Sequence, residues 1–423
     1  MKTKRTLCLL LLILSGIVSG AHGEHYRTDI NPALLYYQAF LVAPKGSEDY
    51  SQYLTTNDWW KGWCRGQPLS DRFGSAVSNF DAELGFVRQA AHQTVPCDWG
   101  IDLSRGAETL LPQLARAKRL VIDSQYQIPW DLQNGNQAEA RDDLLADLAL
   151  GRNISRTRTL ISVLVEIAIE SLVCDEAAKD FHRFSPETLQ QLLDGFDVAP
   201  PRGTIAECVP TEKAIHDRTL SRFEDLQKRY PDNNEAGMDA LRGLLNFYTQ
   251  DEWERLTNAA GGTLGGVIQE VRDSGPSYAK LGQFMALPYG EYEGRLKYDS
   301  QRDLLKAQFE KPGNPLFSQT VSSWQGCRHR EFRIEVDLAM VRAAIEYQLR
   351  GEAGLKSVAD PCGNGPFSFQ RFVLNGVDRG FELKSQLILS KGIPESYIFV
   401  ETDGPPFNVT GVKVGRAVPE SAR

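Results

Sequence analysis

Glu166 and Glu170 are the pair of residues in this sequence best suited to chemistry. They lie four residues apart, so in a helix their carboxyl groups share one face. Their neighbours are almost all apolar, and burial raises the pKa of a carboxyl group because it disfavours the charged form. Such a group can act as a general acid at neutral pH. The pair therefore indicates acid–base chemistry of the kind that glycosidases and lyases perform with carboxylates.

A structural role explains the same pair. Each glutamate could bind an arginine and hold neighbouring helices in register, as buried ion pairs do. If the pair lines a pocket, Glu166→Gln should reduce ligand binding without lowering stability. If the pair is structural, the same change should lower stability and leave binding unchanged. The arginines that lie near enough in sequence are Arg141, Arg152 and Arg158.

Three tryptophans form a second candidate site. Trp59, Trp60 and Trp63 lie close together in sequence and could line a platform for a sugar or an aromatic ligand. The alternative, which we favour, is that they pack a loop onto the core beside Cys64.

The sequence lacks the motifs of several common enzyme classes. It has no Gly-x-Ser-x-Gly, no His-Glu-x-x-His and no Ser-x-x-Lys in an active-site context. Its histidines are not paired at ligand spacing, and no Cys-x-x-Cys pair indicates a redox centre or a zinc ribbon. We therefore expect neither a metal site nor a cofactor.

The segment that contains the two glutamates, residues 156–181, is too apolar to lie on a surface. Between Leu160 and Ala178, thirteen of nineteen residues are apolar, and its polar side chains form one narrow stripe at 100° per residue. Alternating β-branched residues also fit a strand. The length of the segment and the helix-forming sequence on both sides favour a buried central helix. Its two carboxylates argue against a bilayer.

Capping residues and apolar spacing predict further helices on both sides of this segment. Stops such as Gly151 separate them into helical hairpins. We therefore expect a mainly α fold over residues 24–358, with stacked antiparallel helical hairpins around the buried central helix. The expected helices cover residues 32–43, 47–60, 71–92, 108–132, 137–150, 186–196, 205–230, 239–250, 276–310 and 329–350.

Residues 359–412 differ from the rest of the chain in their pattern of residue types. Runs of β-forming residues alternate there with Asn-Gly and other turn sequences, which predicts a small antiparallel sheet. We expect residues 413–423 to form a flexible tail.

The first residues follow the layout of a secretory signal peptide. Three cationic side chains precede an apolar run from Leu7 to Val18, and small residues follow. We expect residues 1–23 to be cleaved and the protein to be exported, to the periplasm or the cell exterior, with no transmembrane segment left. An uncleaved anchor is the alternative. Loss of three cationic side chains would take the formal net charge from −8 to about −11. The remaining chain is acidic and has no polybasic run, so we do not expect it to bind nucleic acid.

Six cysteines follow the expected signal peptide, an even number that is compatible with three disulfides in an oxidising compartment. The sequence does not select one pairing. We expect neighbours to pair, Cys174 with Cys208 and Cys327 with Cys362. Buried thiols are the alternative.

Two short stretches resemble known families. Gly135 followed by Ala140 resembles the turn and second helix of tetratricopeptide repeats, which implies stacked helix pairs and no specific ligand. Asp147 stands where that family has another alanine, and no repeat of about 34 residues recurs.

The second stretch lies near the C-terminus. Asp360 to Phe369 (DPCGNGPFSF), followed by Gly380 to Ser385 (GFELKS), resembles the C-terminal strand region of type II secretion pseudopilins. In that family a helix also precedes the sheet. The pilin processing site and the Gly-Asp-Gly calcium loop are missing here, so the resemblance implies neither filament assembly nor calcium binding. Taken whole, the chain resembles helix-rich exported bacterial proteins with such an ending.

Two functions of different classes follow from these observations. The first is a non-enzymatic exported scaffold that binds a protein, a peptide or an envelope component. The second is an extracytoplasmic hydrolase or lyase that acts on carbohydrate with paired carboxylates. The scaffold is favoured because it requires no residue that the sequence lacks.

Overall fold

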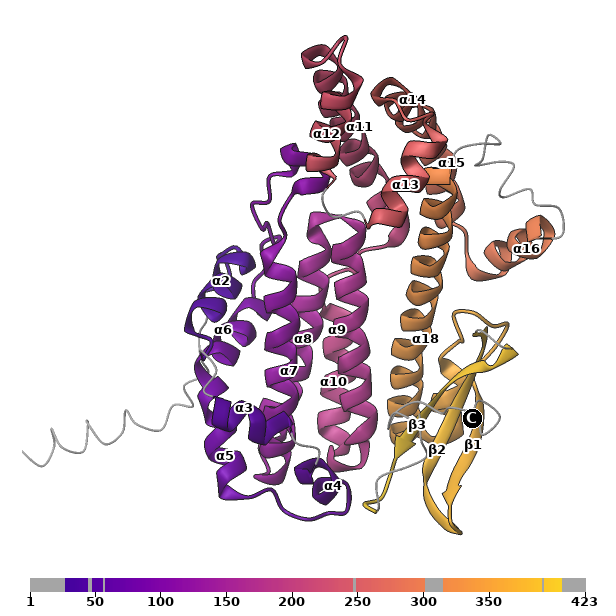
Figure 1. The fold of residues 1–423 in the computed structure, drawn as a ribbon. Helices are drawn as coiled ribbons and strands as arrows, with labels where there is room; N and C mark the ends of the chain where they lie inside the picture. Colours follow the sequence, from indigo (N-terminus) through magenta and orange to yellow (C-terminus); the bar gives the residue numbers. More distant parts are fainter. Residues whose placement is uncertain are drawn as a thin grey trace, which may run out of the picture.

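A computed structural model describes residues 27–44, 48–55, 58–245, 249–300, 315–389 and 392–404. The expected signal peptide and the expected C-terminal tail lie outside these residues. The described part is mainly helical and has a three-stranded antiparallel sheet near its C-terminal end (Figure 1). This arrangement confirms the predicted fold class.

Residues 160–179 form a helix, as predicted, and the alternative of a strand is wrong. Thr159 and Ser162 form a capping box at its start. It belongs to a group of helices that run side by side along the middle of the molecule (Figure 1). These helices are α7 (Pro112–Gln133), α8 (Gln137–Ile154), α9 (Leu160–Lys179), α10 (Pro186–Val198) and α18 (Pro315–Ser357).

Five short helices precede α7 in the described residues: four form a layer outside α7 and α8, on the left side of Figure 1, and the fifth, Asp58–Cys64, lies at the bottom, where Trp63 binds Asp180 at the end of α9. The prediction of one helix over residues 71–92 is wrong, because a 3₁₀ turn at Ser78–Phe80 divides it. The side chains of Ser78 and Asn79 donate hydrogen bonds to the carbonyl of Ser75 (3.1 and 3.0 Å). Such local bonds compete with regular helix geometry. The helices are α2 (Pro32–Val42), α3 (Glu48–Thr55), α4 (Asp58–Cys64), α5 (Asp71–Val77) and α6 (Asp81–Ala91).

Helices α11 to α14 form a smaller unit that projects from one end of the molecule (Figure 1). This unit has its own hydrophobic cluster, which includes Phe223, Leu241 and Val267. Two further helices follow it in the part of the chain that the structure describes before α18. The elements are α11 (Ile205–Arg229), α12 (Asn234–Leu244), α13 (Gln250–Ala259), α14 (Leu264–Ser274), α15 (Ser277–Met285) and α16 (Tyr289–Ser300).

The sheet comprises β1 (Ser368–Leu374), β2 (Val377–Ile388) and β3 (Pro394–Val400) in that order. Asn375 and Gly376 form the tight turn between the first two strands, both with positive φ, as hairpin turns of this type require. One face of the sheet packs on the helices, where Phe381 and Phe399 meet the ring of Phe181.

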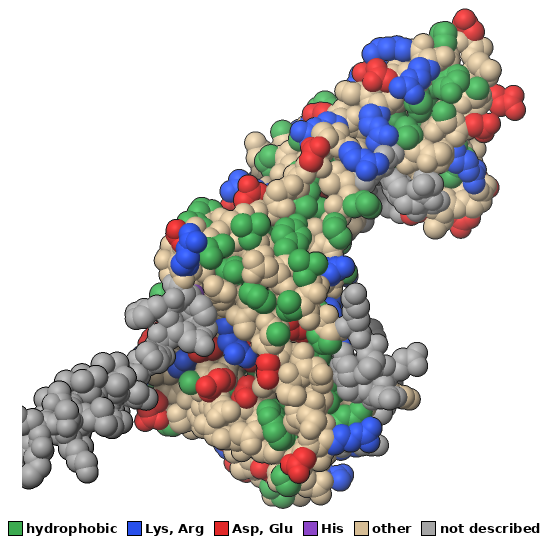
Figure 2. All heavy atoms as spheres, turned by 90° about the vertical axis from the view of Figure 1, so that its left-hand side faces the viewer, with side chains coloured by type: hydrophobic (Ala, Val, Ile, Leu, Met, Phe, Trp, Pro, Cys, Tyr) green, Lys and Arg blue, Asp and Glu red, His purple; other side chains and the backbone are tan. Residues whose placement is uncertain are grey.

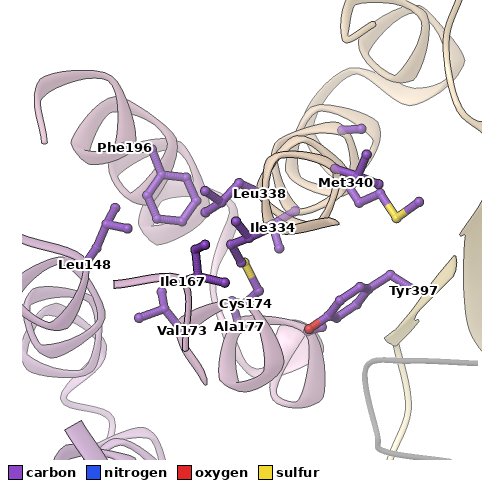
Figure 3. Packing of buried hydrophobic residues seen from close by; sticks show 14 of the residues in the cluster. Leu148, Ile167, Val173, Cys174, Ala177, Phe196, Ile334, Leu338, Met340 and Tyr397 are labelled. Carbon is purple, nitrogen blue, oxygen red and sulfur yellow. The ribbon is translucent and has the colours of Figure 1, made fainter. Parts of the chain in front are cut away.

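The main core lies between α9, α10, α18 and the sheet. Figure 3 shows Ile167 and Cys174 of α9 close to Ile334 and Leu338 of α18, and all four belong to one buried cluster. Each fully buried aliphatic side chain contributes about 1.5–3 kcal/mol relative to an exposed one. This cluster therefore fixes the position of α18 against the other helices.

The sequence analysis predicted that Gly151 ends a helix, and this prediction is wrong. Helix α8 continues to Ile154, and Gly151 lies against α9. A Cβ atom at this position would lie 2.9 Å from Cγ2 of Ile169, which is fully buried. The glycine is needed for packing and not for a turn.

We predict that Gly151→Ala lowers the free energy of unfolding by about 1–3 kcal/mol, because the new methyl group overpacks the interface between α8 and α9. Gly85→Ala in α6 is the matched control, since no atom lies within 4 Å of its added Cβ. Helix propensity alone should make that variant more stable by about 0.5–1 kcal/mol. Urea unfolding of both variants checks the prediction, and equal stabilisation of both would contradict it.

Candidate functional site

The polar stripe of α9 faces the interior of the protein. Ser162, Glu166 and Glu170 are each 0% exposed, whereas Ile161 on the other side of the helix is 50% exposed. The expectation that the segment at residues 156–181 is too apolar to reach the surface is therefore wrong at Ile161. The orientation of α9 follows from the partners that its glutamates bind.

Glu170 is bound by two arginines. Its Oε1 accepts a hydrogen bond from Nε of Arg152 on α8 (3.0 Å), and its Oε2 accepts one from Nε of Arg202 (2.8 Å). Arg202 lies in the turn that joins α10 to α11. Arg152 also donates to the carbonyl of Pro200 in the same turn (3.0 Å). One buried carboxylate thus joins α8, α9 and the turn.

Glu166 binds the backbone of this turn. Both of its carboxyl oxygens lie near the N–H of Gly203, at 3.2 and 3.1 Å. Burial and the nearby charge of Glu170 raise the pKa of Glu166 to about 8, so the group is mostly protonated at neutral pH. A Cβ atom on Gly203 would lie 2.7 Å from Cβ of Ser155, which is why glycine stands here.

Helix α18 completes the arrangement. Oε1 of Glu331 accepts a hydrogen bond from the N–H of Ile205, the first residue of α11 (3.0 Å), and Glu331 also pairs with Arg328. Glu335 lies 3.6 Å from Arg202 and 3.8 Å from Arg328. We refer to the seven residues as the glutamate–arginine cluster: Arg152, Glu166, Glu170, Arg202, Arg328, Glu331 and Glu335.

This geometry favours a structural role for Glu166 and Glu170. A catalytic acid must reach the atom that it protonates, with a heavy-atom distance of about 2.6–3.2 Å. Both glutamates are fully buried, and both oxygens of Glu170 are bound by arginine. Of the arginines that the sequence indicated, Arg152 binds Glu170, whereas Arg141 pairs with Asp142 (2.6 Å). Arg158 ends the 3₁₀ turn after α8 with a φ of 52°.

The three tryptophans do not form one exposed platform. Trp59 donates to the carbonyl of Leu54 (2.8 Å), and its ring lies 4.9 Å from that of Phe73. Trp63 is 3% exposed, and its Nε1 donates to Asp180 at the end of α9 (2.8 Å). Trp60 is half-buried. Trp59 and Trp63 pack α4 onto the core beside Cys64.

The six cysteines at positions 64 to 362 are thiols in the structure. Cys208 donates a weak hydrogen bond to the carbonyl of Thr204 (3.3 Å), and burial raises the pKa of its thiol. The pairings of Cys174 with Cys208 and of Cys327 with Cys362 stay predictions.

Ser274, His216 and Asp217 lie at the distances of a catalytic triad, which the sequence did not indicate. Nε2 of His216 is 2.9 Å from Oγ of Ser274, and Nδ1 is 3.3 Å from Asp217. However, Nε2 also lies 2.9 Å from the carbonyl of Val271, which can only accept a hydrogen bond. Nε2 must therefore carry a proton and cannot take one from Ser274. Ser274 is also buried, so His216 serves to join α11 to α14.

Several other carboxyl groups are buried between α6, α7, α8 and α9. Burial raises the pKa of Glu83 to about 8 and that of Asp143 and Glu176 to about 7. Asp123 lies beside Glu83, and the proximity of the two carboxyl groups raises the pKa of Glu83 further. Within the described ranges, no group of three or more His, Cys, Asp or Glu side chains is placed to hold a metal ion.

Helix α2 has an exposed apolar face that the sequence reading did not single out. Leu34, Tyr37, Leu41 and Val42 lie on its outer side, and Leu41 is 79% exposed. Figure 2 shows the side of the molecule on which α2 lies, with hydrophobic side chains gathered across its middle. The signal in the sequence is the eleven-residue run PALLYYQAFLV, which contains no charged residue.

No protein-family model, no curated protein and no solved structure matches this chain. The resemblances to tetratricopeptide repeats and to pseudopilins therefore stay predictions. Among the helices that the structure describes, none combines the length and the apolar character that spanning a membrane requires.

We predict that Glu170→Gln lowers the free energy of unfolding by about 3–5 kcal/mol, because it leaves two buried arginines without their shared counter-charge. Glu352→Gln is the matched control, since Glu352 forms only an exposed pair with Lys356 on α18 and should have little effect. Urea unfolding compares the two variants. Similar stability of both would show that the ion pairs of Glu170 do not stabilise the fold.

We also predict that stability decreases as the pH rises from about 5 to about 8. Glu83, Glu166, Asp143 and Glu176 have pKa values of about 7 to 8 in the folded protein, above about 4 in the unfolded chain. The folded state therefore binds these protons more tightly than the unfolded state does. The resulting stabilisation is complete at a pH below the pKa values of the unfolded chain, and it is lost as the pH rises through the pKa values of the folded protein. Thermal unfolding across this range measures the effect, which Glu83→Gln should reduce. A thermal unfolding midpoint that increases with pH over this range would contradict the prediction.

Proposed function

We propose that this protein is an exported, non-enzymatic helical scaffold that binds a protein or peptide of the cell envelope through the outer face of α2. The observation that supports this proposal is the exposed row of Leu34, Tyr37, Leu41 and Val42 on a helix without charge. Residues at this spacing share one face of a helix. Contiguous exposed apolar surface of this kind marks interaction sites in soluble proteins.

The inner side of α2 holds the helix firmly in place. The ring of Tyr36 stacks on that of Trp99, with centroids 5.5 Å apart, and its hydroxyl accepts a hydrogen bond from Asn153 (3.1 Å). Arg116 on α7 donates to the carbonyl of Phe40 near the other end of the helix (3.1 Å). The outer face is thus presented in a fixed conformation, and preorganisation of this kind reduces the entropic cost of binding.

The dimensions of the face indicate what it would bind. Eleven residues of helix extend about 16 Å, which matches about three turns of a partner helix. A stable interface buries about 800 Å² on each partner, and a face of this length offers less. We therefore propose a transient complex with a short apolar or amphipathic segment, since α2 offers no charge for an ionic partner.

The alternative of a carbohydrate hydrolase has less support. It would require Glu166 and Glu170 to face a substrate across a cleft, with a carboxyl separation of about 5–9.5 Å. Both side chains are instead fully buried among arginines and backbone amides.

Leu41→Glu tests the proposal, because it places a charge in the face without disturbing the core. Val198→Glu is the matched control: Val198 ends α10 as Leu41 nearly ends α2, and the two are 84% and 79% exposed. Co-purification from the native envelope fraction, quantified by mass spectrometry, should show a partner that falls about tenfold or more with Leu41→Glu, equivalent to about 1.4 kcal/mol. The same partner should persist with Val198→Glu. Identical capture by the wild type and both variants would overturn the proposal.

A further inference from the structure

The turn between α10 and α11 is held by buried groups from three helices at four residues between Pro200 and Ile205. Arg152 of α8 binds the carbonyl of Pro200, and Glu170 of α9 binds the side chain of Arg202. Glu166 of α9 accepts from the N–H of Gly203, and Glu331 of α18 accepts from that of Ile205. The start of α11 is therefore fixed by carboxyl groups that belong to other helices.

The charges of the glutamate–arginine cluster do not balance unless it holds a proton. The cluster has three arginines and four glutamates. Glu170, Glu331 and Glu335 each lie within 4 Å of an arginine nitrogen, whereas the hydrogen-bond partners of Glu166, the N–H of Gly203 and the hydroxyl of Ser155, are neutral. An unpaired charge is costly in a buried site, so Glu166 is the group that holds the proton.

We infer that the cluster is a proton-dependent clamp on the turn at residues 200–204. While Glu166 is protonated, the turn stays packed between α9 and α18, where it contacts Glu166 and Glu331. When Glu166 loses its proton, two adjacent buried carboxylates share Arg202, and their repulsion favours a state in which the turn leaves the seam and both groups reach water. Because α11 begins at this turn, the clamp governs how the projecting unit of α11 to α14 is attached to the rest of the protein.

Two other ionisable groups near the cluster, Glu212 and Cys208, supply no positive charge that could balance it. Glu212 of α11 accepts from the N–H of Leu160 at the start of α9 (2.7 Å), and burial raises its pKa. The thiol of Cys208 also has a pKa raised by burial, so it adds no charge at neutral pH. Three further charged groups on the surrounding elements have partners of their own: Glu207 with Thr204, Asp197 with Arg342, and Glu293 with His329.

Limited digestion with trypsin tests the clamp, because Arg202–Gly203 is a bond that trypsin can cleave only when the turn is released. We expect the cleavage rate at this bond, relative to a short peptide of the same sequence, to rise about tenfold between about pH 7 and about pH 9. The midpoint should lie near the pKa of Glu166, about 8. In Glu166→Gln the relative rate should stay at its low value throughout, because an amide cannot lose the proton.

Glu83→Gln serves as the control, since it removes another buried carboxyl group with a raised pKa at a distance from the turn. This variant should keep the wild-type pH dependence at Arg202–Gly203. A flat wild-type curve, a midpoint far from pH 8, or the same rise in Glu166→Gln would each overturn the clamp. If Glu166→Gln does not fold, the wild-type curve and the Glu83→Gln curve still decide the question.

Discussion

The ion pairs of Glu170 with Arg152 and Arg202 are the interaction on which the rest of the fold depends. A buried carboxylate is tolerated only when its charge is compensated, so α8 and the turn before α11 must both lie against α9. This requirement fixes the rotation of α9 about its axis. It explains why the polar stripe faces inward and why Ile161 faces outward.

Several carboxyl groups are buried inside the helical body. Burial raises the pKa of some of them, so that a bound proton neutralises their charge in place of a counter-ion. Asp143 and Glu176 each lie beside a cationic side chain, whereas Glu83 lies beside a second carboxyl group. Neutral carboxyl groups can act as hydrogen-bond donors as well as acceptors.

The apolar face of α2 and the glutamate–arginine cluster illustrate two different uses of a rigid helical body. The face lies on the outside, where aromatic packing beneath α2 keeps the helix in a fixed position. The cluster lies inside, where it joins the body to the projecting unit of α11 to α14. In both places, contacts between distant segments hold a short element in a defined arrangement.

The sequence by itself determined the features that depend on neighbouring residues. Caps such as Ser185 and Thr204 and the turn at Asn375–Gly376 were predictable because their hydrogen bonds and φ angles are local. The tertiary structure decided the rest. Arg202 reaches Glu170 across 32 residues, and His216 reaches Ser274 across 58. Gly151 allows close packing of α8 on α9 and does not form a turn. Helix α2 has one apolar face that is exposed. No local pattern reveals these features, because the partner of each group, or the lack of one, is set only when distant segments pack together.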